Sequence, residues 1–202
     1  MAIVIQRLTP ATVDAAFAVF QTVLGEHPQV TKAAITERLV HGTGLFYGAV
    51  DTATGAMVGI KFGYIEGATC IGRGIAVLPA YRRQGVGTQL LWQFEQDLAT
   101  RPTVTSYVFG SASETGIPFH LAQGYQPRVL LQLADAALRD TLDLAELHIT
   151  QEGYNAAYQV YQIYADLPAP EQNLASLRRL QQHLPDVNVG FVFARALGER
   201  AD

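Results

Sequence analysis

The sequence predicts an α/β fold in which a mixed, mostly antiparallel sheet is flanked by helices. Apolar residues switch along the chain between strand-like alternation and a helical spacing of three or four. Residues 45–78 contain consecutive strands with no helix between them, which favours antiparallel pairing. Residues 71–109 then read as strand, long helix and strand, which favours a parallel crossover.

Composition limits the kind of protein that this chain can be. Of its 202 residues, 49% are apolar, so it can build a substantial core. The formal net charge of −4 argues against a general nucleic-acid binder, which needs a basic surface. No histidine lies at ligand spacing from a cysteine or a second histidine, so we expect no metal site. With one cysteine, no signal peptide and no membrane-length apolar run, we expect a cytoplasmic protein without a membrane partner.

The N-terminal part of the chain predicts one strand and two helices. Residues 3–8 alternate as in a strand. Thr9-Pro10 is a helix-entry signal, and apolar residues then recur at helical spacing as far as Gly25, which ends the helix. Thr31 is placed to cap a second helix, which the glycines of residues 41–44 stop.

Three strands follow. Residues 45–50 and 57–65 flank a turn at 51–55, so they predict a hairpin. Residues 71–78 form the third strand, which ends at Pro79.

A long amphipathic helix comes next and ends at Arg101-Pro102, with Trp92 expected to pack. The elements expected after it are a strand at 103–109, a short helix between Pro118 and Gly124, and a strand at 128–133.

The last third of the sequence predicts a separate module. We expect a domain at 1–135 and a ββαβ extension at 136–202. The extension's expected elements are strands at 146–150 and 157–163 around a turn at 151–155, a helix at 174–184 and a strand at 187–193. Its role is open: it covers the acceptor site, supplies a dimer interface or completes the sheet.

Four tyrosines recur at close spacing in this extension: Tyr154, Tyr158, Tyr161 and Tyr164. They are interpreted either as half-buried sheet residues or as a dimer face, so a homodimer is one partner to consider.

The segment from Arg82 to Thr88 is the part of the sequence that indicates chemistry. Gly85 and Gly87 let the backbone bend and let a ligand approach closely. The amides of Gln84 to Thr88 then lie at a helix N-terminus, which is a ready anion site. Arg82 and Arg83 add charge-assisted donors, so we expect a phosphate or pyrophosphate ligand. The alternative is a tight turn with solvated arginines.

Walker and Rossmann loops are disfavoured, because Gly-Lys-Ser/Thr is absent and residue 90 is leucine.

This segment resembles the coenzyme-binding motif of the GNAT (Gcn5-related N-acetyltransferase) family, Arg/Gln-x-x-Gly-x-Gly/Ala, read here as Arg82-Arg-Gln-Gly85-Val-Gly87. The preceding Val77-Leu-Pro-Ala-Tyr-Arg82 is similar to the family's usual approach, and the order of elements matches to about residue 134. The resemblance implies a GNAT-type fold and acetyl-CoA as co-substrate. It implies that the coenzyme is held by the backbone of Ile75, Ala76 and Val77 and by the loop residues Arg82, Arg83, Gln84, Gly85, Val86, Gly87 and Thr88.

The catalytic groups are less clear. GNAT proteins often carry a tyrosine acid in the pattern Asn-x-x-Ala-x-x-Leu-Tyr-x-x-x-Gly-Phe, and here the sequence from Ser113 to Tyr125 is similar. The resemblance puts His120 at the tyrosine position and Ser113 at the asparagine position, beside the coenzyme. We hypothesise that His120 is the acid near the CoA sulfur; the alternative is a packing residue, with water as the acid.

No general base is evident. Residues 71–75 carry no carboxylate, and nearby Glu66 and Glu114 read as ordinary surface charges. An amine of low pKa or a water chain needs no dedicated base. His27 lies between the first two helices, where GNAT acceptors commonly bind, or else is a simple loop histidine.

The resemblance implies an N-acetyltransferase that acts on a primary amine, in a small molecule or a peptide, within a ternary complex. The alternative is a non-catalytic acyl-CoA-binding or interaction protein. An RNA- or ribosome-associated modifier is disfavoured by the acidic balance.

Overall fold

The structure is a computed structural model that describes residues 2–111 and 116–197. The chain folds into two compact units, residues 2–107 with 196–197 and Val108–Arg195. One strand, β5 (Ser106–Ser111), runs from the first unit into the second. Ser113 and Glu114, which the sequence analysis singled out, lie outside the described residues.

The described residues of the first unit form four strands and three helices apart from the start of β5. In chain order these are β1 (Ile3–Arg7), α1 (Val13–Leu24), α2 (Lys32–Val40), β2 (Gly44–Asp51), β3 (Met57–Glu66), β4 (Thr69–Val77) and α3 (Val86–Ala99). Short 3-10 turns at Pro10–Thr12 and Pro79–Tyr81 lead into α1 and toward α3. The predicted cap of α2 is confirmed, because the Thr31 hydroxyl accepts a hydrogen bond from the Ala34 amide at 3.1 Å.

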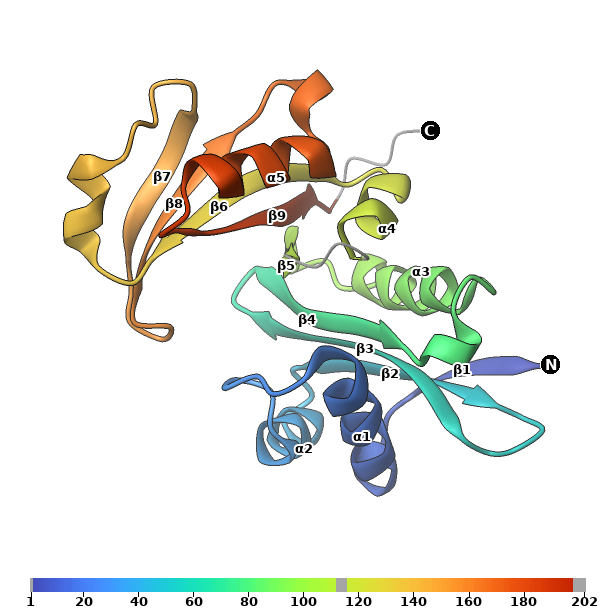
Figure 1. The fold of residues 1–202 in the computed structure, drawn as a ribbon. Coiled ribbons are helices and arrows are strands. Elements are labelled where there is room, and N and C mark those ends of the chain that lie inside the picture. Colours follow the sequence, from blue (N-terminus) through green and yellow to red (C-terminus); the bar gives the residue numbers. More distant parts are fainter. Residues whose placement is uncertain (1, 112–115, 198–202) are drawn as a thin grey trace. The chain divides into compact units, whose positions relative to one another are not determined.

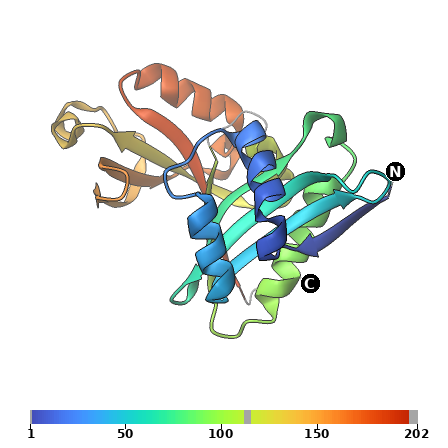
Figure 2. The same ribbon diagram turned by 90° about the horizontal axis from the view of Figure 1, so that it is seen from below.

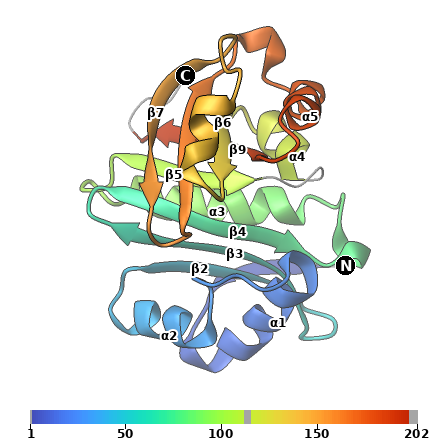
Figure 3. The same ribbon diagram turned by 60° about the vertical axis from the view of Figure 1, so that its left-hand side comes forward.

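Strands β1 to β4 pair in sequence order, and each pair is antiparallel. The predicted hairpin of β2 and β3 is therefore confirmed. Helices α1 and α2 cover one face of these strands and α3 covers the other (Figures 1 and 3). Figure 2 looks onto the face that α1 and α2 cover. The result is the mixed α/β fold with a mostly antiparallel sheet that the sequence predicts.

Aromatic rings fill the layer between α1 and the sheet. Phe20 of α1 stacks on Phe62 of β3 with ring centroids 5.6 Å apart, and Phe46 of β2 meets Phe62 edge-on at 5.4 Å. All three are buried. This core holds α1 against β3 and β4, and so fixes where the loop after α1 lies.

On the other face, α3 buries one apolar stripe, made up of Val86, Leu90, Leu91, Phe94 and Leu98. Trp92 is 58% exposed, so the expectation that it packs is wrong. At 100° per residue, position 92 is turned about 200° from Leu90 and from Phe94, which puts it on the opposite side of the helix.

The start of β5 differs from the predicted strand at 103–109. The chain turns at the end of α3, where the Val104 amide donates to the Arg101 carbonyl at 3.0 Å. The strand therefore begins only at Ser106.

Within the part of the second unit that the structure describes, two helices and four strands follow β5. In chain order these are α4 (Gly116–Ala122), β6 (Gln126–Leu133), β7 (His148–Asn155), β8 (Val160–Asp166), α5 (Leu174–His183) and β9 (Asn188–Ala196). The strands pair antiparallel in the order β9-β6-β8-β7. Short 3-10 turns lie at Ala136–Thr141 and Ala169–Glu171.

The turn predicted at 151–155 is wrong. These residues belong to β7, and the chain reverses over residues 156–159, where Gln159 takes a left-handed φ of 54°. Of the four tyrosines, Tyr161 and Tyr164 lie on β8 and are half-buried, whereas Tyr154 on β7 is 64% exposed. The sheet-residue interpretation fits Tyr161 and Tyr164; the dimer face stays a prediction.

The predicted boundary at residue 135 also stays a prediction. Strand β6, which lies before that boundary, pairs with β8 and β9, which lie after it. In the second unit, residues on both sides of position 135 therefore share one sheet.

No helix in the described part of the chain is long and apolar enough to cross a membrane.

Candidate coenzyme loop and acceptor site

A β-bulge interrupts β4 four residues before its end. Phe62 of β3 faces Gly74 and Gly63 faces Gly72, so Arg73 is the extra residue of β4. Gly74 has a φ of +134°, a conformation that side-chain-bearing residues rarely adopt. A Cβ atom there would lie only 2.7 Å from the Cδ1 atom of Leu24 at the end of α1. The backbone conformation therefore favours glycine at residue 74, whereas the exposed Leu24 side chain can move aside.

Past the bulge, β4 continues through the three residues expected to hold the pantetheine arm, Ile75, Ala76 and Val77. Ala76 is buried, while its two neighbours are half-buried. The Leu78 amide donates to the Val58 carbonyl at 2.9 Å, so the strand stays tied to β3 up to the loop.

The loop after β4 turns through two left-handed residues. Arg83 has a φ of 59° and Gly85 a φ of 79°. Gly85 is the N-cap of α3, which begins at Val86. A left-handed backbone is unusual for arginine, and such outliers gather at ligand-binding sites. The sequence indicated the glycine but gave no sign that Arg83 is also left-handed.

The amides of this loop are suited to bind an anion. The Gln89 amide closes the first helical bond, to the Gly85 carbonyl at 2.9 Å. Among the described residues, the amides of 83–88 donate none of the backbone hydrogen bonds found outside helices and strands. The first amides of a helix have no acceptor within that helix. Together with the positive end of the α3 dipole, they are available to an anion where the sequence predicts an anion site, and that role stays a prediction.

Two side chains brace this loop against the strand that precedes it. The Arg82 Nε atom donates to the Val77 carbonyl at 2.9 Å, and Gln84 Nε2 donates to the Ala80 carbonyl at 2.9 Å. Arg82 therefore uses at least one donor on the protein itself. Thr88, in the first turn of α3, is exposed.

A buried lysine supports the bulge from the side of α3. Lys61 on β3 is 2% exposed, and its Nζ atom donates to the Phe62 carbonyl at 3.1 Å and the Gly74 carbonyl at 3.5 Å. The ammonium lies 4.5 Å from the ring centroid of Phe94. Burial lowers the pKa of Lys61 to about 8, although the charges of Cys70 and Glu95 oppose that shift.

On the face covered by α1 and α2, two arginines meet one tyrosine. The guanidinium carbon of Arg38 on α2 lies 3.9 Å from the ring centroid of Tyr64 on β3. The Arg73 NH2 group donates to the Tyr64 hydroxyl at 2.6 Å. Tyr64 is buried, and both arginines are half-buried. Three elements thus bring two positive charges together at the bulge.

His27 belongs to the same neighbourhood. Burial and, to a smaller extent, the charge of Arg73 lower the pKa of His27 below its usual 6.5. The Gln29 amide donates to His27 Nδ1 at 3.1 Å, so the neutral ring carries its proton on Nε2. In this tautomer the outer nitrogen of His27 is a donor.

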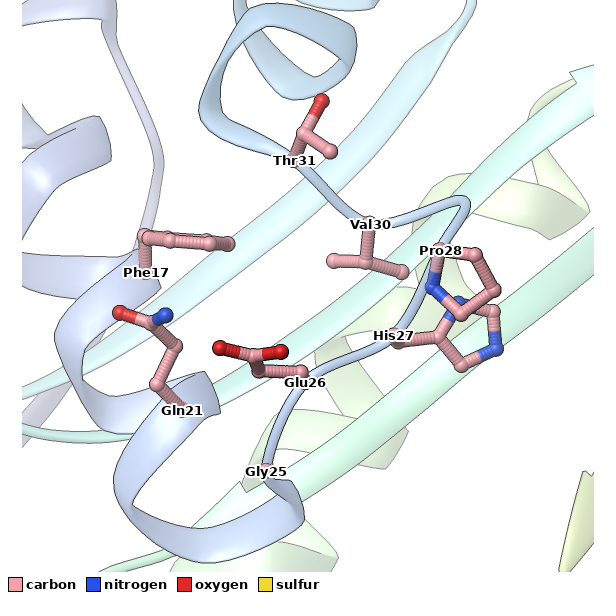
Figure 4. Close-up of a pocket in the computed structure, with 8 residues that line it drawn as sticks. All are labelled: Phe17, Gln21, Gly25, Glu26, His27, Pro28, Val30 and Thr31. Atoms are coloured by element: carbon pink, nitrogen blue, oxygen red, sulfur yellow. The ribbon is translucent and has the colours of Figure 1, made fainter.

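A pocket of about 390 Å³ opens between the end of α1 and the start of α2 (Figure 4). Its lining residues are Phe17, Gln21, Gly25, Glu26, His27, Pro28, Val30 and Thr31. In Figure 4 the Glu26 side chain points toward Gln21, whereas the His27 ring points the opposite way, beside Pro28.

His120 lies on α4 in the second unit and is 4% exposed. Its ring is surrounded by aromatic rings, with centroid distances of 4.3 Å to Phe109, 5.1 Å to Phe119 and 5.2 Å to Phe193. Tyr125 adds an edge-on contact at 6.0 Å. Close ring packing of this kind fits the packing interpretation of His120, and the acid role stays a prediction.

Among the described residues, no group of three histidine, cysteine, aspartate or glutamate side chains is placed to hold a metal ion. Glu66 ends β3 and is exposed.

Sequence reasoning missed Lys61, Arg38, Tyr64 and Arg73. Two of them left a signal: Lys61 is the one charged residue of its strand before the final Glu66, and Arg73 is the one charged residue of β4. The grouping around Tyr64 left none, because it depends on the register of β3 with β4 and on where α2 packs.

Comparison with known proteins agrees with this geometry. Residues 42–127 match the family model described as acetyltransferase (GNAT) domain. That range contains β2 to β5, α3 and α4, and hence both the bulge and the loop. None of the curated proteins matches this chain.

Solved structures show the same fold at low sequence identity. The ribosomal-protein-S18-alanine N-acetyltransferase from Escherichia coli is 13% identical with a TM-score of 0.55, over 100% of this chain and 97% of that one. Ard1 from Thermoplasma volcanium is 20% identical with a TM-score of 0.53, over 83% of this chain and 100% of that one. A GNAT-family acetyltransferase from Staphylococcus aureus Mu50 is 14% identical with a TM-score of 0.54, over the same shares.

Proposed function

Since the chain carries a GNAT acetyltransferase domain over residues 42–127, we propose that it is an N-acetyltransferase that moves an acetyl group from acetyl-CoA to a primary amine. The observation that carries the proposal is the run of amides at 83–88, which opens α3 through two left-handed residues. A loop of this kind suits the pyrophosphate of a coenzyme.

In the proposed complex, the amides of 83–88 bind the pyrophosphate and Arg83 adds positive charge. The backbone of Ile75, Ala76 and Val77 pairs with the pantetheine arm. Arg82 braces the loop through the Val77 carbonyl, as its 2.9 Å hydrogen bond allows. The buried Lys61 steadies the carbonyl of Gly74, so the strand presents its amides in a fixed geometry.

The reaction needs no covalent enzyme intermediate. The neutral amine attacks the thioester carbonyl carbon, a C–N bond forms, and an amide of β4, for which Val77 is the candidate, donates to the oxyanion. The C–S bond then breaks, and the leaving thiolate takes a proton while the new ammonium loses one. We propose His120 as the proton donor to sulfur and Ser113 as a coenzyme contact, both from their positions in the family motif.

We include a cytoplasmic location in the proposal. Its support is a single cysteine, Cys70, whose side chain is buried and reduced.

A second candidate function is acyl-CoA binding without catalysis. The aromatic enclosure of His120 favours it, as does the lack of a carboxylate between Ile71 and Ile75. Both candidates predict that acetyl-CoA raises the melting temperature of the protein, but only the first predicts release of CoA thiol with a panel of primary amines. An absence of thiol release despite coenzyme binding rejects the enzyme.

The loop assignment has its own test in Thr88, which is exposed at the third position of α3. A glutamate there favours the helix, because it faces the positive end of the dipole, but it repels a diphosphate. We expect Thr88→Glu to fold normally and to weaken acetyl-CoA affinity by about 10-fold or more, since the site gains a negative charge beside the place proposed for the diphosphate. Thr88→Gln is the uncharged control and should retain most of the affinity in calorimetry.

A further inference from the structure

The group of Arg38, Tyr64 and Arg73 has features that a purely structural cluster does not need. The guanidinium carbon of Arg38 lies over the Tyr64 ring, 3.9 Å from its centroid. Stacking uses the face of the guanidinium and leaves the N–H groups at its edge pointing outward. A guanidinium edge binds a carboxylate with two parallel hydrogen bonds.

Arg38 has no ion pair within the described part of the chain, where the arginine ion pairs involve Arg7, Arg101, Arg128, Arg139 and Arg179. It is half-buried, so part of the residue reaches solvent, and its contact with the Tyr64 ring restricts its movement. Restricting a charged side chain before the ligand arrives lowers the entropic cost of binding.

Arg73 adds a second positive charge and fixes the tyrosine. Its NH2 group donates to the Tyr64 hydroxyl at 2.6 Å, so the platform under Arg38 is itself held from β4. Arg73 is also the extra residue of the bulge, directly before Gly74 and two residues before the strand segment proposed to hold pantetheine. The positive charge therefore lies beside the proposed reaction centre and on the face where α1 and α2 form the pocket.

We infer that Arg38, with Tyr64 and Arg73, is a specificity site for the acceptor, and that the amine acetylated by this protein carries a carboxylate. The inference rests on the proposed function, because it assigns the acceptor of the same reaction. The Arg38 edge binds the carboxylate, and Arg73 contributes to the positive field that attracts it.

The other charged groups of this region are compatible with such an acceptor. His27 carries its proton on Nε2 and so presents a donor. Glu26 is the carboxylate that lines the pocket, and in Figure 4 it points away from His27 toward α1.

The test compares unbranched ω-amino acids of increasing chain length with their carboxamides, which keep the amine and remove only the negative charge. CoA thiol release is measured under saturating acetyl-CoA for wild type and Arg38→Gln. We expect wild type to prefer the carboxylates, and Arg38→Gln to lower kcat/KM for them by about 10- to 100-fold, through KM, while the carboxamides are unaffected.

Lys32→Gln is the matched control, since it removes one exposed positive charge from the same helix and should leave the preference intact. If wild type turns over carboxylates and carboxamides equally, or if Arg38→Gln keeps the preference for carboxylates, the proposed specificity site is wrong. Neither result contradicts the proposed acetyltransferase activity. No thiol release with either series, although acetyl-CoA binds, rejects the acyl transfer itself, and the acceptor site with it.

Discussion

At the scale of single residues, Lys61 is the strongest departure from what an ordinary core contains. A charged ammonium lies between β3 and α3, where it reaches two carbonyls and the face of Phe94. Because burial lowers its pKa to about 8, the native state gives up the Lys61 proton more easily than the unfolded chain does, where the usual value is 10.5. Stability and pH are therefore linked through this one side chain.

The sign of that linkage can be tested. Between pH 8 and pH 10 the unfolded state holds the Lys61 proton and the native state does not, so rising pH stabilises wild type by roughly 1 kcal/mol per pH unit from this group. Below pH 8 both states are protonated and the contribution is constant. In Lys61→Met this rise is absent. Urea unfolding of both proteins from pH 7 to pH 10 measures it, and parallel curves would show that Lys61 does not titrate as described.

Substitutions at His120 distinguish a packing role of this side chain from its proposed role as an acid. Phenylalanine fills the same aromatic enclosure formed by Phe109, Phe119 and Phe193 but cannot transfer a proton. If His120 is the acid, His120→Phe keeps the melting temperature close to that of wild type and lowers kcat by about 100-fold or more. His120→Ala additionally loses stability, by about 2–4 kcal/mol, because it leaves a cavity. Unchanged kcat in His120→Phe would establish the packing role.

Single residues also mark the limit of sequence reasoning. The loop glycines were predictable, because their spacing before an amphipathic helix has few physical explanations. Arg38 and Tyr64 were not, because they are 26 positions apart and meet only once α2 packs beside β3. The left-handed backbone of Arg83 was equally hidden, since nothing in an arginine requires it.

At the scale of secondary-structure elements, the bulge of β4 is the feature that shapes the site. It leaves Arg73 without a partner residue on β3, and it brings the backbone of Gly74 close to Leu24 at the end of α1. The bulge could not be read from the sequence, although the spacing Gly72-Arg73-Gly74 is compatible with it. Helix starts were more predictable, because the caps are local: Thr31 and Asn173 both accept hydrogen bonds from the amides of their own helices.

A pair of glycine substitutions tests the bulge. Gly74→Ala takes a φ of +134° that residues with a side chain rarely adopt, so we expect a loss of about 2–3 kcal/mol of stability. Gly67→Ala also has a positive φ, of 59°, but its Cβ meets open space, so it should cost about 1 kcal/mol. Chemical unfolding compares the two. If Gly74→Ala costs no more than Gly67→Ala, the bulge is not held as described.

At the scale of the whole molecule, the chain divides into two compact units, and the second depends on the extension beyond residue 135. Its strand β6 lies between β8 and β9, and the buried side chains of Val129, Leu131 and Leu133 need that sheet. A chain shortened to residues 1–135 should therefore lose the ordered environment of His120, because Phe193 and both partners of β6 are removed. Near-ultraviolet circular dichroism and the NMR signals of the phenylalanine, tyrosine and histidine rings report this loss. A shortened chain with native spectra would make the extension an independent appendage.

The central claim is that the amides of residues 83–88 bind the pyrophosphate of acetyl-CoA. The most direct measurement is a crystal structure of the full chain grown with acetyl-CoA. We expect density for the pyrophosphate within hydrogen-bond distance of these amides at the start of α3, with the thioester running along Ile75–Val77. Coenzyme density at any other place, with the amides of residues 83–88 contacting only water, would contradict the account.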